Sequence, residues 1–160
     1  MKIGILADTH IRKGRNLPPV VWETLAEVDM ILHAGDIGSS SFLKDLESIA
    51  PVIAVKGNGD WMMEGLPEKA IFNLAHVKVG MIHGHQGPGQ NTPQRALNTF
   101  AQDRVDVIVF GHSHIPYKTY TSGILLFNPG SPTEKRGSEF HSMGLMNIND
   151  SDFDIQHIFF

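Results

Sequence analysis

Short apolar runs rich in β-branched residues recur along the chain, which is typical of buried strands. They cover residues 2–7, 29–35, 51–57, 76–84, 106–111 and 123–128. Helical patterns lie between several of these runs, at residues 18–28, 40–50 and 92–103. A proline begins the first helical pattern, a serine cap precedes the second, and a threonine cap with a first-turn proline begins the third. This alternation of strands and helices predicts an α/β fold built in layers.

The pattern changes after residue 115. Segments 117–128, 141–149 and 152–160 look like strands without a helix between them, as expected of antiparallel pieces of a second sheet. We therefore expect two stacked sheets with the helices outside. No internal repeat, low-complexity tract or linker interrupts the chain, so residues 1–160 are expected to form a single domain.

Composition narrows the class of protein. With 160 residues, 41% of them hydrophobic, the chain is long enough to bury a substantial core. The formal net charge of -4 offers no broad basic face, which argues against general nucleic-acid binding. The chain has no cysteine, so any metal would be held by histidine, aspartate, glutamate or asparagine. No apolar run approaches the length of a membrane span, and a soluble, cytoplasmic protein is expected. Whether it forms a homo-oligomer is left open.

Polar side chains follow five of the predicted strands at the point where each apolar run ends. They are Asp8 and His10, then Asp36, then Asn58, then His83 and His85, and finally His112 and His114. In open α/β sheets, ligands bind in the crevice outside the carboxyl ends of the strands. We therefore expect these side chains to converge on one site.

Local spacing favours the same site. Asp8 and His10 are two residues apart, as are His112 and His114. In an extended chain such residues project to the same side, with α-carbons roughly 6.6 Å apart. Imidazole, carboxylate and amide oxygen together suit manganese, iron, nickel or zinc. The pattern therefore predicts a metal site.

Simpler explanations compete for each residue taken alone. An aspartate after a strand is more often a helix cap or turn former than a ligand, and a single histidine there is usually structural. The coincidence of seven such residues favours the metal site. The isolated histidines are interpreted as structural: His33, His76, His141 and His157.

Three further features have two explanations each. The segment Trp61–Met63 either lines a substrate lip or forms an ordinary hydrophobic contact or subunit interface. The stretch "FNPGSP" at 127–132 is adequately explained as a turn after a strand. Four basic residues either attract an anionic substrate or are simply solvated: Arg12, Lys13, Arg15 and Arg136.

The ordered motifs D-x-H, G-D, G-N-x-D, H-G-H and G-H-S-H, followed by N-P-G-S, resemble those of the calcineurin-like metallophosphoesterases. More narrowly, the chain is similar to the small, single-domain phosphodiesterase branch (YfcE-like), and the match runs from Asp8 to about Arg136. The resemblance implies the metallophosphatase fold, a four-layer α/β/β/α sandwich with two mixed β-sheets. It also implies two divalent metal ions, commonly manganese, with iron, nickel or zinc as alternatives.

The resemblance further implies a role for each residue. One ion would be held by Asp8, His10 and His114, and the other by Asn58, His83 and His112. Asp36 would bridge them, a role suited to the two oxygens of a carboxylate, while His85 would lie close by without being a ligand. Asp36, Asn58 and His85 would take part in catalysis. The implied activity is the hydrolysis of small phosphodiesters by a hydroxide that two metal ions activate.

The chain departs from the wider family at Gly59. Many relatives have histidine at this third position of G-N-x-D, where it can protonate the leaving group, and the small branch often has cysteine. Here His85 or a water would serve instead, or only esters with easy leaving groups are hydrolysed. Asp60 is then expected only to shape the turn.

Two other functions compete with hydrolysis of small phosphoesters. A metal-binding scaffold or protein-interaction module of the same fold, with little or no catalysis, is the alternative, and the missing proton donor mildly favours it. A nuclease is disfavoured by the acidic balance of the chain.

Overall fold

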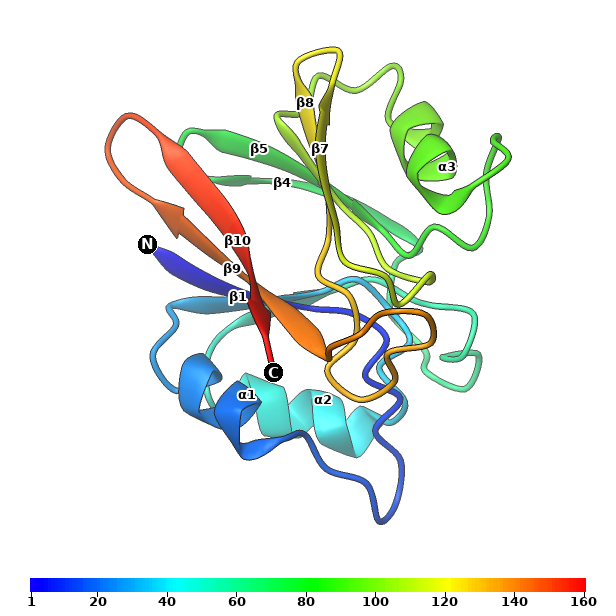
Figure 1. The fold of residues 1–160 in the computed structure, drawn as a ribbon, viewed down its shortest axis with the longest axis vertical. Helices are drawn as coiled ribbons and strands as arrows, with labels where there is room; N and C mark the ends of the chain where they lie inside the picture. Colours follow the sequence, from blue (N-terminus) through cyan, green and yellow to red (C-terminus); the bar gives the residue numbers. More distant parts are fainter.

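A computed structural model describes residues 1–160 as two five-stranded sheets packed face to face, with three helices outside them (Figure 1). The elements in chain order are β1 (Lys2–Leu6), α1 (Pro19–Leu25), β2 (Met30–His33), α2 (Ser40–Glu47), β3 (Val52–Ala54), β4 (Lys69–Leu74), β5 (Val77–Ile82), α3 (Thr92–Thr99), β6 (Val107–Val109), β7 (Tyr117–Thr121), β8 (Ile124–Asn128), β9 (Ser142–Ile148) and β10 (Phe153–Phe159).

Both sheets are mixed, and each has a parallel part. The first sheet has the strand order β10-β9-β1-β2-β3, in which β1, β2 and β3 run parallel and β9 is antiparallel to β1. The second has the order β4-β5-β6-β8-β7, in which β5, β6 and β8 run parallel and the edge strands β4 and β7 are antiparallel to their neighbours.

The layers follow from which face each side chain occupies. Alternate side chains of β1 point to opposite faces of the sheet. Ile3 and Ile5 lie in the core between the sheets, while Leu6 packs with α1 and α2. On the far side, α3 packs through Ala96 and Phe100 against the outer face of the second sheet. The predicted four-layer α/β/β/α sandwich with two mixed sheets is therefore confirmed.

Glycine in the sheets marks where the helix layers come close. A Cβ on Gly4 of β1 would lie 2.6 Å from the Leu25 side chain of α1. A Cβ on Gly80 of β5 would lie 2.7 Å from the Phe100 ring beside α3. In each sheet, a residue of the helix layer thus packs directly on a glycine of an interior strand, where there is no room for a side chain.

Two sequence-based predictions about elements are wrong, and one strand was not predicted. The segments at 141–149 and 152–160 form β9 and β10 of the first sheet, not pieces of a second one. Strand β4 was not predicted, because it is a half-exposed edge strand in which most positions are not buried. The cap of α3 is Asn91, whose side chain accepts the Gln94 N–H, so Thr92 is already inside the helix. None of the helices is long and apolar enough to cross a membrane.

Candidate metal centre

The polar residues that follow the strands gather at one edge of the sandwich. Asp8 and His10 follow β1, Asp36 follows β2, Asn58 follows β3, His83 and His85 follow β5, and His112 and His114 follow β6. Because β1, β2 and β3 are parallel, and so are β5 and β6, the carboxyl ends within each sheet lie together. Contacts between the residues of the two sheets bring these ends to a common place, as the distances below show.

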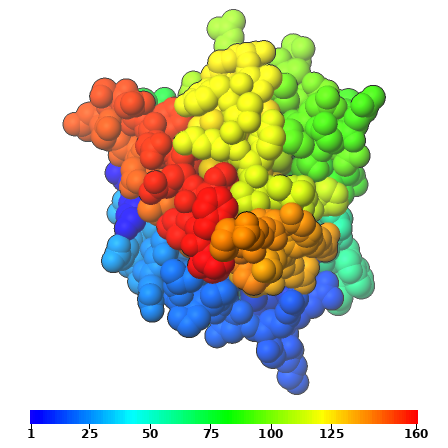
Figure 2. Space-filling view, in the orientation of Figure 1, coloured from blue at the N-terminus to red at the C-terminus, as the bar shows by residue number.

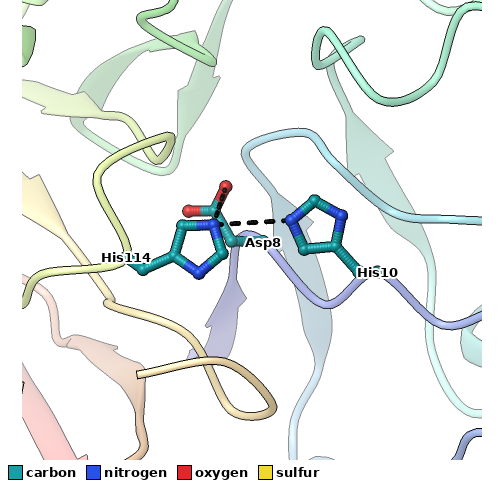
Figure 3. A group of neighbouring side chains, drawn as sticks. All are labelled: Asp8, His10 and His114. Atoms are coloured by element: carbon teal, nitrogen blue, oxygen red, sulfur yellow. Dashed lines mark hydrogen bonds and ion pairs between the residues drawn. The ribbon is translucent and has the colours of Figure 1, made fainter. Parts of the chain in front are cut away.

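The first group of donor atoms comes from Asp8, His10 and His114, whose ligand atoms all lie within 4.8 Å of one another. Figure 3 shows the two imidazole rings turned toward each other with the carboxylate beside His114. The Nε2 atoms of His10 and His114 are 3.4 Å apart, and Nε2 of His114 is 3.6 Å from Oδ1 of Asp8. These residues come from the loops after β1 and β6, so the group joins the two sheets.

The second group contains Asp8, Asp36 and His83, again with ligand atoms within 4.8 Å of one another. Nε2 of His83 is 3.5 Å from Oδ2 of Asp36 and 3.9 Å from Oδ1 of Asp8. Oδ1 of Asn58 lies 3.2 Å from the same Nε2 atom. The amide of Asn58 therefore belongs to this group.

Asp36 lies between the two groups. Its Oδ2 atom is 3.5 Å from Nε2 of His10 and 3.5 Å from Nε2 of His83. Its Oδ1 atom accepts the N–H of Gly59 at 2.6 Å. Only one carboxylate oxygen thus faces both groups, which differs from the expectation that a bridge would use both.

His112 and His85 are placed beside His83 rather than inside the two groups. The ring centroid of His112 is 5.3 Å from that of His83, and the ring of His85 is 5.3 Å from His83 and 6.2 Å from His112. The backbone N–H of His112 donates to Oδ1 of Asp8 at 3.1 Å. The structure therefore brings together all the residues singled out in the sequence.

Hydrogen bonds orient two of the imidazoles. Nδ1–H of His83 donates to the carbonyl of Ala34 at 2.8 Å, and Nδ1–H of His114 donates to the carbonyl of Glu134 at 2.7 Å. Each ring is then left with an Nε2 lone pair that points into the group. Histidines that bind metals are commonly held in this way by a carbonyl on the other nitrogen.

The donor set fits a divalent ion better than it fits a hydrogen-bond network. Separations of 3.4–3.6 Å are too long for good hydrogen bonds, but two donors each about 2.1 Å from one tetrahedral ion are about 3.4 Å apart. Oδ2 of Asp8 is buried and has no hydrogen-bond partner. A buried carboxylate oxygen left in this way is costly without a cation. The residues present therefore fit divalent metal ions.

The pKa values of the buried carboxyl and imidazole groups are displaced from their usual ranges. Burial raises the pKa of Asp8 to about 7, although His83 opposes it. Burial would also raise the pKa of Asp36, but its hydrogen bond with His83 and the charge of that residue hold the value well below the usual range. For His83, burial lowers the pKa, and the contacts with Asp36 and Asp8 more than reverse this. These shifts arise because carboxyl and imidazole groups are buried close to one another.

Burial acts on the other imidazoles in one direction. It lowers the pKa of His10, His85 and His112, and it lowers the pKa of His114 to about 4. Metal ligands must be neutral imidazoles, so burial keeps these rings in the form that binds an ion.

The backbone at the strand ends is left-handed, contrary to the extended chain that the spacing argument assumed. The residues with positive φ are Asp8 (54°), His10 (46°), Asp36 (55°), His112 (68°) and His114 (61°). This conformation costs non-glycine residues roughly 1 kcal/mol or more each, and it is concentrated at functional sites. Asp8 and His10 do meet in the first group, although both have left-handed backbone, whereas His112 and His114 lie at different parts of the site.

The stretch "FNPGSP" was interpreted from the sequence as a simple turn. In the structure, its side chains make hydrogen bonds to the loops that carry the site. Nδ2 of Asn128 donates to the carbonyl of Gly111 at 2.9 Å and to Oγ of Ser113 at 3.0 Å. Oγ of Ser131 donates to the carbonyl of Asp8 at 2.8 Å. Two loops that carry predicted ligands are thus tied to one turn after β8. The polar residues within an otherwise apolar stretch were the available signal.

Two buried polar residues support the site from behind. His33, fully buried, lies with Nε2 2.8 Å from Oγ1 of Thr9, which in turn donates to the carbonyl of Ile37 at 2.9 Å. The carboxylate of Asp60 accepts the N–H groups of Ile37, Gly38 and Gly57 at 3.0–3.2 Å. In this structure both residues join loops that carry the site, and Asp60 does shape its turn.

Basic side chains border the first group. Arg15 pairs with Glu134 at 2.8 Å, and Arg136 lies 3.6 Å from the same carboxylate. Figure 2 shows the loop after β8 (orange) packed against the blue N-terminal segment that follows β1. Two of the four basic residues are therefore engaged with Glu134, and the charge that faces the site is partly neutralised.

Comparison with known proteins gives a consistent result. A family model described as the calcineurin-like phosphoesterase superfamily domain matches residues 1–151. The probable metallophosphoesterase MJ0623 of Methanocaldococcus jannaschii is 39% identical over 139 residues, which cover 85% of this chain and 70% of that protein.

Two further proteins extend the comparison. The phosphodiesterase MJ0936 of the same organism is 27% identical over 144 residues, 81% of this chain and 83% of that protein. The crystal structure of Vps29 from Entamoeba histolytica in complex with Zn²⁺ covers 99% of each chain with a TM-score of 0.80 and 23% identity. The last similarity shows the fold alone.

Proposed function

The chain belongs to the calcineurin-like phosphoesterase superfamily, and on that premise we propose that it is a metal-dependent phosphodiesterase of small substrates. The similarity to a phosphodiesterase supports the choice of diesters. The observation that carries the proposal is the position of Asp36, whose Oδ2 atom is 3.5 Å from a histidine of each donor group. A carboxylate placed between two sets of donors would serve both members of a pair of neighbouring ions.

We assign the donors as follows. Asp8, His10 and His114 would hold one ion, Asn58, His83 and His112 would hold the other, and Asp36 would touch both. The ligand types suit manganese, iron, nickel or zinc, and the family resemblance favours manganese among them. Two bound ions would supply Lewis acidity, since they lower the pKa of water and offset charge on a phosphoryl group.

The protein's own groups would position the ester. Asn58 offers a neutral amide oxygen, which leaves the centre more positive than a third carboxylate would and so favours an anionic phosphodiester. His85 lies beside His83 and His112, and the residue lines the same hollow as Asn58. We assign His85 a polar contact with the substrate rather than with an ion.

Gly59 limits the chemistry to favourable leaving groups. The residue adjoins Asp36 and carries no side chain that could hold a proton. Since proton transfer to the leaving oxygen matters most for poor leaving groups, we expect aryl diesters to react far faster than alkyl diesters.

The direct test is the hydrolysis of bis(p-nitrophenyl) phosphate by the purified protein with and without added Mn²⁺. We expect metal-dependent turnover and about two bound ions per chain, as two-ion sites require. Asp36→Ala should abolish the activity. Asp45→Ala, which removes an exposed carboxylate on α2, is the matched control and should leave it unchanged.

The outcomes separate hydrolysis from a scaffold role. Turnover that Asp36→Ala removes and Asp45→Ala preserves supports the proposal. Two bound ions without turnover of any phosphoester would instead favour a metal-binding interaction module of this fold. Absence of both ions and turnover would contradict both functions.

A further inference from the structure

We propose that Trp61 forms the floor of a nucleoside subsite beside the metal centre, so that one arm of the phosphodiester substrate carries a base with an exocyclic amino group. The inference rests on the proposed function and specifies its substrate. It is carried by a hollow of about 300 Å³ that opens next to Asn58 and His85. The side chains around it that the inference uses are Lys56, Asn58, Trp61, Glu68, His85 and Gln86.

Trp61 is an exposed aromatic residue on a fixed turn. Its exposed fraction is 72%. Asp60, the preceding residue, is 2% exposed, and Met63, two residues further along the chain, is 6% exposed. The N–H of Met63 donates to the carbonyl of Asp60 at 2.8 Å, and the Asp60 carboxylate accepts three backbone N–H groups. The indole is therefore presented by a turn that is anchored on both sides. An exposed indole held in place in this way is available to stack on a planar group.

The position of the hollow connects Trp61 to the reaction. Asn58, assigned above to one ion, and His85, assigned to the substrate, line the same hollow as the indole. A phosphoryl group at the metal centre would therefore have one ester arm directed along Trp61. A planar ring is the group that stacks on an indole without needing a closed pocket.

The remaining side chains select among planar groups. No side-chain hydrogen bond or ion pair within the protein involves Lys56, Glu68 or Gln86, so these three side chains are free to contact a ligand. The N–H of Lys56 donates to the carbonyl of Pro67 at 2.8 Å, which holds the start of the Glu68 segment against the Lys56 strand end. An ionised carboxylate only accepts hydrogen bonds, so Glu68 favours a base that offers N–H groups and disfavours a further phosphate. A nucleoside arm with an amino-bearing base meets these conditions, whereas an alkyl arm does not.

A binding test needs no turnover. The chain has two tryptophans, so Trp22→Phe leaves Trp61 as the single indole. We expect AMP to quench the fluorescence of this variant, in the presence of Mn²⁺, in a saturable manner, and ribose 5-phosphate and inorganic phosphate to have no such effect. Glu68→Gln in the same background should weaken the binding of AMP. Equal responses to AMP and ribose 5-phosphate would overturn the subsite.

A kinetic test uses substrates that share one leaving group. The p-nitrophenyl esters of AMP and of methyl phosphate both release p-nitrophenol, so their ratio of kcat/KM reports the other arm. We expect the AMP ester to be favoured roughly tenfold, as for one base stacked on an aromatic side chain. Trp61→Ala should bring the ratio close to one, and Trp61→Phe should retain most of it.

The control is Met62→Ala, which removes a neighbouring side chain that is 74% exposed on the same turn and should leave the ratio unchanged. Turnover without a preference for the AMP ester would overturn the subsite and leave the phosphodiesterase standing. Quenching by AMP without turnover of either ester would support the subsite and contradict the phosphodiesterase. A dimer that Trp61→Ala dissociates, with no effect of AMP, would show that the residue serves an interface and would also overturn the proposal.

Discussion

The backbone N–H of Gly59 donates to Oδ1 of Asp36 at 2.6 Å, and this hydrogen bond leaves Oδ2 of the carboxylate facing both donor groups. A Cβ at position 59 would lie 3.0 Å from Oδ1 and 3.3 Å from Cγ of Asp36. The backbone of Gly59 is not left-handed, so space rather than conformation is what favours glycine there. The absence of a side chain therefore has two consequences: no proton donor, and a close approach to Asp36.

Substitutions at Gly59 can separate these two consequences. Gly59→Ala should lower the turnover of p-nitrophenyl diesters several-fold, because the added methyl group displaces Asp36 by a few tenths of an ångström. Gly59→His should displace Asp36 in the same way and also adds an imidazole. Relative to Gly59→Ala, it should raise the rate with phenyl or alkyl diesters and leave p-nitrophenyl diesters little changed. The measurement is the slope of log kcat against leaving-group pKa, and equal slopes in both variants would contradict the role given to the missing donor.

The two donor groups should lose their ions separately. His114 belongs to the first group alone and His83 to the second alone, so His114→Ala and His83→Ala should each reduce the metal content by about one ion per chain. Asp36→Ala should reduce it by more, because its Oδ2 atom faces both groups. Elemental analysis after dialysis gives the count. His76→Ala, at an exposed position in the turn before β5, is the control, and an equal loss in that variant would contradict the assignment.

The stability of the metal-free protein should fall as the pH is lowered through the range in which His33 titrates. Burial lowers the pKa of His33 to about 4, from 6.5 when exposed. Below pH 6.5 the unfolded chain takes up a proton that the folded chain does not, so stability is present above this pH and is lost toward pH 4. Between pH 7 and pH 5 this group should cost about 2 kcal/mol of unfolding free energy.

The variant His33→Gln isolates that effect, since an amide keeps a donor and an acceptor but does not titrate. Urea unfolding at pH 7 and pH 5, in the presence of a chelator, should show a larger loss for the wild type than for His33→Gln. Parallel losses in the two proteins would mean that other groups account for the acid sensitivity.

Asn128→Ala should weaken the site without touching a predicted ligand. Asn128 is fully buried, and its amide holds the carbonyl of Gly111 and the hydroxyl of Ser113 on either side of His112. Leaving those groups unpaired should cost about 1–3 kcal/mol of stability. Metal titration monitored by calorimetry should show weaker binding at the same time. A variant that is destabilised but binds metal as the wild type does would show that Asn128 supports the fold alone.

The sequence predicts the parallel strands well because each is an apolar run followed by a break, and the polar residues after them meet for topological reasons. It does not predict where β9 and β10 pair, since their patterns of apolar residues are compatible with either sheet. It misses β4 because an edge strand exposes much of both faces. The left-handed backbone of Asp8 and His10 is also hidden, because aspartate and histidine are common in ordinary turns as well.

The details of the candidate site depend on contacts between distant segments. The turn of Asp36 toward both groups follows from the N–H of Gly59, and the fixing of the Asp8 loop follows from Ser131. Each of these bonds joins a backbone atom to a side chain far away in the chain, and spacing within one motif contains no information about it. The motifs therefore indicate which residues meet, whereas the fold determines which atoms face one another.

The pairing of β1 with β9 has a consequence for how the protein is made. Strand β1, which is followed by Asp8 and His10, pairs Lys2 with Asn147 and Ile3 with Met146. On the ribosome, the first strand must therefore wait for nearly the whole chain to be synthesised before its second neighbour exists. Pairings so distant in sequence form slowly, because a long loop must close first. We therefore expect the strand that positions Asp8 and His10 to complete its pairing late in folding.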